Sequence, residues 1–321
     1  MRKVAHYTLT LLLTCLALGA ASAQLTAEEY IEKALAKADA GEFQYAATLA
    51  DEAIARDSTV VKYYYIRAGI EKELSDDLSP LEYYGKALEL DTTNASTFNE
   101  IGLFLGYRGK VDDAVALFGY AIQYAASDSA RLSYITNRGA VRKVINDQEG
   151  AMADFRLVLD EDPEHVAALN NLAASYGEQG FLAESAVTLE QLSRVVKTDK
   201  MRKIVAINLG MTYTQLDSLD LALRWFDIAH KYDPEQPLLL SNRADALRRL
   251  QRYPEALESI NASIALYPEN SWAYYNLARI YFDQGLTEEG CRALGFAEHY
   301  GFAVTYGEDA GALGEAQGCG D

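Results

Sequence analysis

Small side chains recur along this chain with a spacing of 34 residues, which lengthens to 37 in two places. The first set of small positions is Ala34, Ala68, Gly102, Gly139, Ala173, Gly210, Ala244 and Ala278. A second, mostly small set follows twelve residues later in each copy, and a third, mostly apolar set follows seven residues after that. Spacings kept through eight copies indicate tandem repeats of one structural unit.

Bulky apolar side chains occupy one fixed place in the repeat, three residues before the third set. They are Tyr84, Phe118, Phe155, Leu189, Phe226, Ile260 and Leu294. Small residues let two helix backbones approach closely, and bulky residues fill the space between them. The pattern therefore predicts a pair of antiparallel helices in each repeat.

Turn residues fall between the expected helices. Glycines separate the first and second helix in four copies, at Gly41, Gly109, Gly180 and Gly285. Three second helices end just before a proline, which is tolerated in the first turn of a helix but not in its interior. The predicted repeats are about 27–60, 61–94, 95–131, 132–165, 166–202, 203–236, 237–270 and 271–304, with a tail at 305–321.

This pattern resembles the tetratricopeptide repeat, whose consensus runs W-x2-L-G-x2-Y, then G-x-Y-x2-A-x3-F-x2-A, then P. The sixth copy carries it at Leu209, Gly210, Tyr213, Ala222, Phe226, Ala229 and Pro234. The first two copies depart most, since Ser58 and Thr92 replace the terminal proline and Pro80 replaces a small residue. The resemblance implies an all-α, right-handed superhelical solenoid of eight helix-turn-helix repeats, with the first helices lining a concave surface.

Both 37-residue intervals place three extra residues at a junction between repeats, near 124–131 and near 194–203. Three residues are almost one helical turn, so we expect lengthened helices or wider connections there. Long loops and low-complexity linkers are absent from the sequence, and it therefore predicts a single structural domain.

We call each residue of the first small set the small marker of its repeat. In repeats four to eight an asparagine lies two residues before this marker. The series is Asn137, Asn171, Asn208, Asn242 and Asn276. Asparagine is a mediocre helix former, and its amide offers both a donor and an acceptor to a peptide backbone. One interpretation is a ladder that grips an extended peptide in the groove, as the family resemblance implies. The alternative is that each amide bonds to a neighbouring helix.

Repeats seven and eight add arginines and aromatic residues to the expected concave side. Arg249 and Arg279 are candidates to hold a partner's carboxylate, because a guanidinium binds one in a bidentate manner. The alternative is pairing with the chain's own acids, such as Asp245. Trp272 and Tyr275 are candidate aromatic anchors for a partner.

The first 23 residues are typical of a secretory signal peptide. Arg2 and Lys3 precede an apolar run, and Ala21, Ser22 and Ala23 supply small residues for cleavage. We therefore expect an exported protein, periplasmic or secreted, of bacterial type, with no membrane span after cleavage. The rival interpretation is a lipoprotein anchored through Cys15.

Cleavage would leave two cysteines, Cys291 and Cys319. In an exported chain they can form one disulfide, which would pin the C-terminal tail onto the last repeat. The alternative is a pair of free thiols.

The net charge of −18 disfavours nucleic acid and anionic membranes as partners, because the field of the protein repels phosphate. The three histidines after the signal segment, His165, His230 and His299, lie in different repeats without a second ligand at metal spacing. The sequence thus predicts no enzyme activity, no metal and no cofactor.

The leading hypothesis is a non-catalytic scaffold that binds a protein or an extended peptide in its concave groove, in the cell envelope or outside the cell. The alternative is an assembly subunit of an envelope complex that docks through its outer and end surfaces. The sequence leaves the partner and the oligomeric state open.

Overall fold

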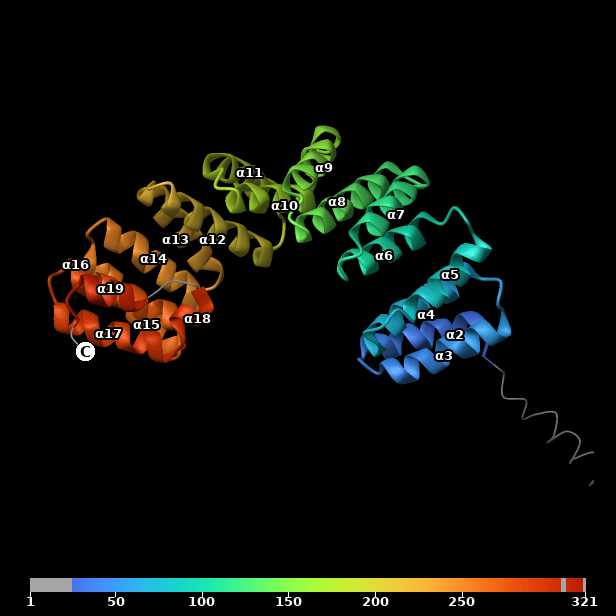
Figure 1. The fold of residues 1–321 in the computed structure, drawn as a ribbon, viewed down its shortest axis with the longest axis horizontal. Coiled ribbons are helices and arrows are strands. Elements are labelled where there is room, and N and C mark those ends of the chain that lie inside the picture. The colour runs from blue at the N-terminus through green and yellow to red at the C-terminus, as the bar shows by residue number, and fades with distance from the viewer. Residues whose placement is uncertain (1–24, 307–309, 320–321) are drawn as a thin grey trace, which may run out of the picture. The chain divides into compact units, whose positions relative to one another are not determined.

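The computed structural model describes residues 25–306 and 310–319, and it consists of antiparallel helical pairs that follow one another along the chain (Figure 1). These ranges contain no β-strand. The expected signal peptide, with Cys15, lies outside the described residues. Contacts between residues divide the chain into two compact units, Met1–Ile145 and Asn146–Asp321.

The first unit consists of three helical hairpins and one further helix. Its elements are α2 (Ala27–Asp39), α3 (Phe43–Arg56), α4 (Val61–Leu74), α5 (Pro80–Leu90), α6 (Ala95–Gly106), α7 (Val111–Gln123) and α8 (Asp128–Val144). Helix α8 packs on both α6 and α7.

The second unit consists of one helix, four hairpins and a short C-terminal pair. Its elements are α9 (Gln148–Glu161), α10 (Val166–Glu178), α11 (Leu182–Val195), α12 (Asp199–Gln215), α13 (Leu219–Tyr232), α14 (Pro237–Arg249), α15 (Tyr253–Leu266), α16 (Ser271–Asp283), α17 (Thr287–His299), α18 (Phe302–Tyr306) and α19 (Ala310–Ala316). The fourth predicted repeat, 132–165, is thus divided between the two units at Ile145.

The repeating small and bulky residues form the core, as the pattern predicts. Ala34, Ala244 and Ala278 have no exposed surface, and the Phe118 and Phe226 rings are fully buried. A Cβ atom on Gly102 would lie 3.1 Å from the Phe118 ring, tighter than most such contacts. The small residue therefore lets the bulky side chain of the second helix lie directly against the backbone of the first.

The extra residues of the 37-residue intervals lengthen two first helices. Helices α8 and α12 each have 17 residues, whereas α10 and α14 each have 13. Ser127 and Thr198 cap them by accepting N–H bonds from Ala130 and Met201. The two helices therefore start at Asp128 and Asp199, four residues before the predicted repeat boundaries at 132 and 203.

One residue in each of seven turns between successive helices adopts a left-handed backbone conformation. The glycines at 41, 109, 180 and 285 do so, as expected, with φ of 76–78°. Three turns use other residues at the same place, namely Asn146, Asp217 and Gln251, with φ of 64°, 58° and 59°. A side chain with a Cβ atom is disfavoured in this conformation, and glutamine lacks the short polar group that helps asparagine and aspartate there.

Cys291 of α17 and Cys319 are joined in the structure, with their Cα atoms 5.5 Å apart. The tail between them packs on the last hairpin: Phe302 and Ala310 have no exposed surface. Helix α17 ends at His299 and α18 starts at Phe302, so the predicted tail boundary at 305 lies within α18.

We expect Gln251→Gly to stabilise the second unit by about 1 kcal/mol, because glycine removes the steric cost of the left-handed turn. Chemical denaturation would measure the gain. The opposite change, Gly180→Ala, should destabilise the same unit by a similar amount. Equal stability of both variants and the parent chain would contradict the argument.

The bridge between Cys291 and Cys319 should form when the chain is produced under oxidising conditions, which lowers the intact mass by two hydrogens. Closing a loop of this length is worth about 3–4 kcal/mol in the chain-entropy account. Reduction or Cys319→Ser should therefore increase hydrogen exchange in α18 and α19 and leave α2–α7 unchanged. Unchanged exchange in the tail would show that packing alone holds it.

Candidate functional site

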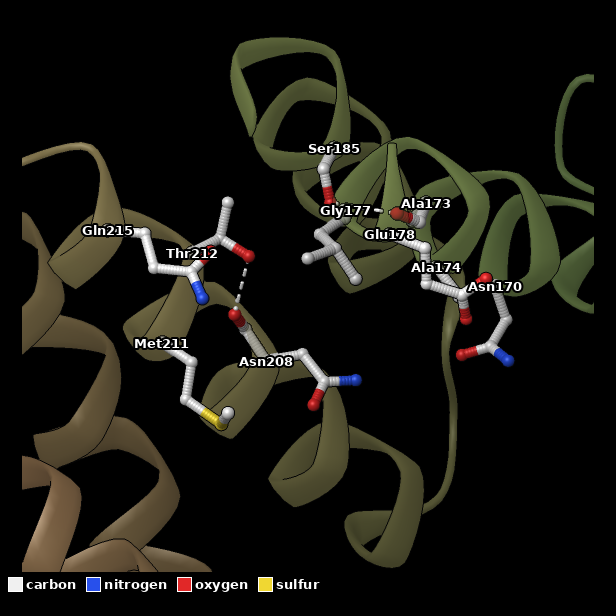
Figure 2. A pocket seen from close by; sticks show the side chains of 11 residues that line it. Asn170, Ala173, Ala174, Gly177, Glu178, Ser185, Asn208, Met211, Thr212 and Gln215 are labelled. Atoms are coloured by element: carbon white, nitrogen blue, oxygen red, sulfur yellow. Dashed lines mark hydrogen bonds between the residues drawn. The ribbon is translucent and has the colours of Figure 1, made fainter. Parts of the chain in front are cut away.

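Neighbouring first helices of the repeats enclose open grooves, and the same positions of each repeat line them. Between α10 and α12 lies a groove of about 410 Å³ (Figure 2). From α10 it is lined by Ala174, Gly177 and Glu178, which lie one, four and five residues after the small marker. From α12 it is lined by Asn208 and Met211, among others.

The next groove, of about 200 Å³, lies between α12 and α14. Met211, Thr214 and Gln215 line it from α12, again one, four and five residues after the marker. Asn242 lines it from α14, two residues before the marker, as Asn208 does in the previous groove. Trp272 of α16 closes the wall.

A third groove, of about 520 Å³, lies in the first unit between α2 and α4 and follows the same register. Leu35, Ala38 and Asp39 line it from α2. Ile66 lies two residues before the marker of α4, in the place that asparagine takes in the second unit. The repeat thus fixes where a groove lies, and the residues at its lining positions fix its chemistry.

The amide of Asn242 is held in one orientation. Its Oδ1 accepts a hydrogen bond of 3.1 Å from Nε1 of Trp272, and an indole nitrogen can only donate. The side-chain nitrogen of Asn242 is therefore directed away from the indole, and it has no hydrogen-bond partner among the described residues. Asn242 is only 9 % exposed, so this is a buried donor left unused at a groove wall.

The other asparagines of the predicted ladder fall into different environments. Asn208 is half-buried in the α10–α12 groove, and Figure 2 shows its amide facing the same space as that of Asn170. Asn137 instead donates to Asn99 of the neighbouring helix α6 at 2.9 Å, as the alternative interpretation expected. Asn276 is fully buried, and Asn171 lines neither groove described for the second unit.

Arginines of the predicted carboxylate site bind acids of the chain itself. Arg249 donates to the backbone oxygen of Thr214 at 2.6 Å and pairs with Asp217 at 2.7 Å. Arg279 pairs with Asp245 at 3.1 Å. Both guanidinium groups therefore already have an acidic partner within the chain, the arrangement that the alternative interpretation described.

Asp245 is the centre of a network that fills the space between α14 and α16. Besides Arg279 it binds Arg248 at 3.0 Å, and Arg248 also pairs with Asp283. Burial opposes the charge of Arg248, but the two carboxylates more than compensate and raise its pKa. Ion pairs thus occupy the position where the α10–α12 and α12–α14 pairs have an open groove.

The two candidate anchor aromatics both stack on the ring of Phe302, but only Trp272 lines one of the grooves described above. Trp272 lines the α12–α14 groove. The ring of Tyr275 stacks on the buried ring of Phe302, with centroids 4.2 Å apart. The C-terminal helix α18 therefore covers Tyr275.

Reasoning from the sequence missed several groove residues, including Asn170, Met211 and Gln215. For Met211 and Gln215 the signal was the register itself, because positions one and five residues after the small marker line these grooves. Asn170, three residues before the marker, had no such signal. No group of three or more metal-ligating side chains occurs in residues 25–306 and 310–319. Nor does any described helix have both the length and the apolar character needed to cross a membrane.

The sequence pattern of the family described as Tetratricopeptide repeat matches residues 241–293. Stress-induced-phosphoprotein 1 of Caenorhabditis elegans is 26 % identical over 190 residues, which cover 57 % of this chain and 55 % of the relative. The chain spans about half the length of the first curated relatives it matches.

Two solved structures resemble the fold. PilW, described as a widely conserved type IV pilus biogenesis factor, has a TM-score of 0.55 at 16 % identity, over 67 % of this chain and 96 % of its own. PilF of Pseudomonas aeruginosa has a TM-score of 0.52 at 18 % identity, over 67 % and 93 %. Such likeness shows the fold alone.

Repeats of this type form protein-interaction scaffolds with extended binding surfaces. The periodic core, the paired helices and the repeat pattern that matches residues 241–293 together show an all-α solenoid of tetratricopeptide-type repeats.

Proposed function

We propose that the second unit binds an extended peptide segment of another protein in the grooves between α10, α12 and α14. The observation that carries the proposal is the amide of Asn242, whose acceptor is occupied by Trp272 and whose buried donor is unused. An unpaired buried donor costs roughly 1–3 kcal/mol, which a peptide carbonyl bound there would offset.

Asn208 and Asn242 occupy equivalent positions of adjacent grooves. Each lies two residues before the small marker of its helix, so the two amides repeat with the structural period. A backbone carbonyl is present at every residue of a peptide, whatever its sequence. Two amides in register therefore suit recognition of the main chain, while the apolar atoms of Met211 and Trp272 contact side chains.

The proposal assigns no catalytic step to the grooves, whose hydroxyl groups, on Ser185, Thr212 and Thr214, each donate to a backbone oxygen of the chain. The scaffold would act in the cell envelope or outside the cell, which the signal-like residues at the N-terminus and the cysteine pair support.

The peptide grip can be tested with a peptide selected from a random library on the full chain. Alanine at both Asn208 and Asn242 should weaken its binding roughly ten- to thirty-fold, since each neutral hydrogen bond contributes about 1 kcal/mol. Fluorescence anisotropy would measure the affinity, and circular dichroism would show that the helices persist. Asn261→Ala on α15, an exposed asparagine on a second helix, is the matched control and should bind like the parent.

Two further variants distinguish a loss of peptide binding from a general loss of structure. Trp272→Phe keeps an aromatic ring but removes the donor that orients Asn242, so binding should weaken while the fold remains. Gly177→Leu should obstruct the α10–α12 groove, because a Cβ there meets only Ser185 Oγ, at 3.6 Å, and leucine also favours helix more than glycine. Unchanged binding in all three groove variants, together with self-association, would favour the assembly-subunit alternative instead.

Export can be checked separately. Expression of the full chain with its N-terminus intact in a bacterial host should give a mature protein that starts at Gln24, because Ala21 and Ala23 are small enough for signal peptidase. N-terminal sequencing of the periplasmic fraction would show it. A lipid-modified N-terminus at Cys15, or uncleaved protein in the cytoplasm, would contradict the prediction.

A further inference from the structure

The groove between α2 and α4 in the first unit has an apolar floor. Leu35 is 41 % exposed, and Ile66 and Phe43 are half-buried beside the buried Ile70. With about 520 Å³, the groove is large enough for more than one side chain of a bound segment. Two residues before the marker, where the second unit has an asparagine, this groove has Ile66. It therefore offers no amide at that position to hydrogen-bond a peptide backbone.

Two carboxylates stand at one end of this apolar floor. Asp39 and Glu73 each lie five residues after the marker of their helix, so they occupy equivalent places on α2 and α4. Both are exposed, and neither has an ion pair within the described part of the chain. The third carboxylate that lines the groove, Glu100, is paired with Lys72 at 3.0 Å.

These two carboxylates lie at helix C-termini, where the helix dipole destabilises a negative charge. Asp39 is the last residue of α2 and Glu73 belongs to the last turn of α4, beside the unpaired carbonyls that give a helix C-terminus its negative end. The lysines of the same turns do not neutralise them, because Lys37 pairs with Glu42 at 2.8 Å and Lys72 with Glu100. The negative potentials of two helix ends and two carboxylates therefore add at one end of the groove.

The phenol of Tyr65 at the groove wall contributes no charge. Its burial, together with the negative charge of Glu100, raises the pKa of Tyr65 to about 12, so it stays protonated near neutral pH. The groove thus has two unpaired negative charges at one end, a neutral phenol and an aliphatic floor.

We propose that the α2–α4 groove is a second binding surface, which takes a basic amphipathic segment of a partner protein. An aliphatic side chain of the segment packs on Leu35 and Ile66, while a lysine or arginine beside it pairs with Asp39 and Glu73. An acidic or phosphorylated segment is repelled, and a wholly apolar one leaves both carboxylates without a partner. The surface lies in the first unit, and it offers two carboxylates and an aliphatic floor, whereas the grooves of the second unit offer asparagine amides. The proposal therefore goes beyond the peptide binding proposed above.

The test uses the full chain and a labelled six-residue peptide of alternating leucine and lysine with capped ends. The double variant Asp39→Asn with Glu73→Gln should bind it about tenfold more weakly at low salt, since two partly exposed ion pairs are lost. The matched control, Asp112→Asn with Asp113→Asn on α7, removes the same charge from another exposed site and should change binding less than twofold. Raising the salt to about 0.5 M should abolish most of the difference.

Two additional measurements distinguish a site from general attraction. Leu35→Ala keeps every charge but shortens the floor, so it should also weaken binding, and replacing leucine by glycine in the peptide should do the same. Thermal unfolding of the Asp39 and Glu73 double variant should occur at an equal or higher temperature, because both acids oppose their helix ends. The proposal would be overturned if both double variants lowered the affinity for the peptide equally. It would also be overturned if neither Leu35→Ala nor glycine in place of the peptide leucines changed that affinity.

Discussion

Close packing of a bulky side chain against a small one within each hairpin is the contact on which the rest of this structure depends. The Phe118 ring lies on Gly102 and the Phe226 ring lies on Gly210, so the two helices of a repeat touch at the backbone. Because these contacts recur at fixed registers, each first helix presents equivalent faces to its neighbours. The grooves and their lining positions follow from that repetition, not from any special loop.

The residue four positions after the marker helps to decide whether a space between first helices stays open. At Gly106 a Cβ atom would meet Val141 of α8 at 2.5 Å, so the absence of a side chain allows these helices to close on each other. At Gly177 the same absence leaves an open groove, since no neighbour comes that close. Arg248 instead fills the space with its ion pairs. One backbone design therefore gives closed, open and charged junctions along the chain.

The sequence predicted the fold well, because the core depends on residue size at fixed spacing and spacing is visible in one chain. Asn208 and Asn242, two residues before their markers, line grooves beside the preceding first helix, and Trp272, six residues before its marker, lines one as well. The sequence did not reveal that Asn137 is bonded to Asn99, or that Asp245 binds two arginines from different helices. Such pairings depend on which side chain lies opposite in the neighbouring helix, and the repeat spacing does not predict that. The division at Ile145 was likewise hidden, because the repeat pattern continues across it without a linker.

Helix α12 contributes Met211 and Gln215 to both of the grooves beside it. A guest in one groove restricts the rotamers of these two side chains, and the ordering cost is then already met when the second groove is filled. Binding of one stretch of a peptide in one groove would therefore favour binding of the adjacent stretch in the next groove. The coupling free energy is the same in both directions. In the peptide-binding function proposed here, shared walls would couple the two grooves without any movement of the helices.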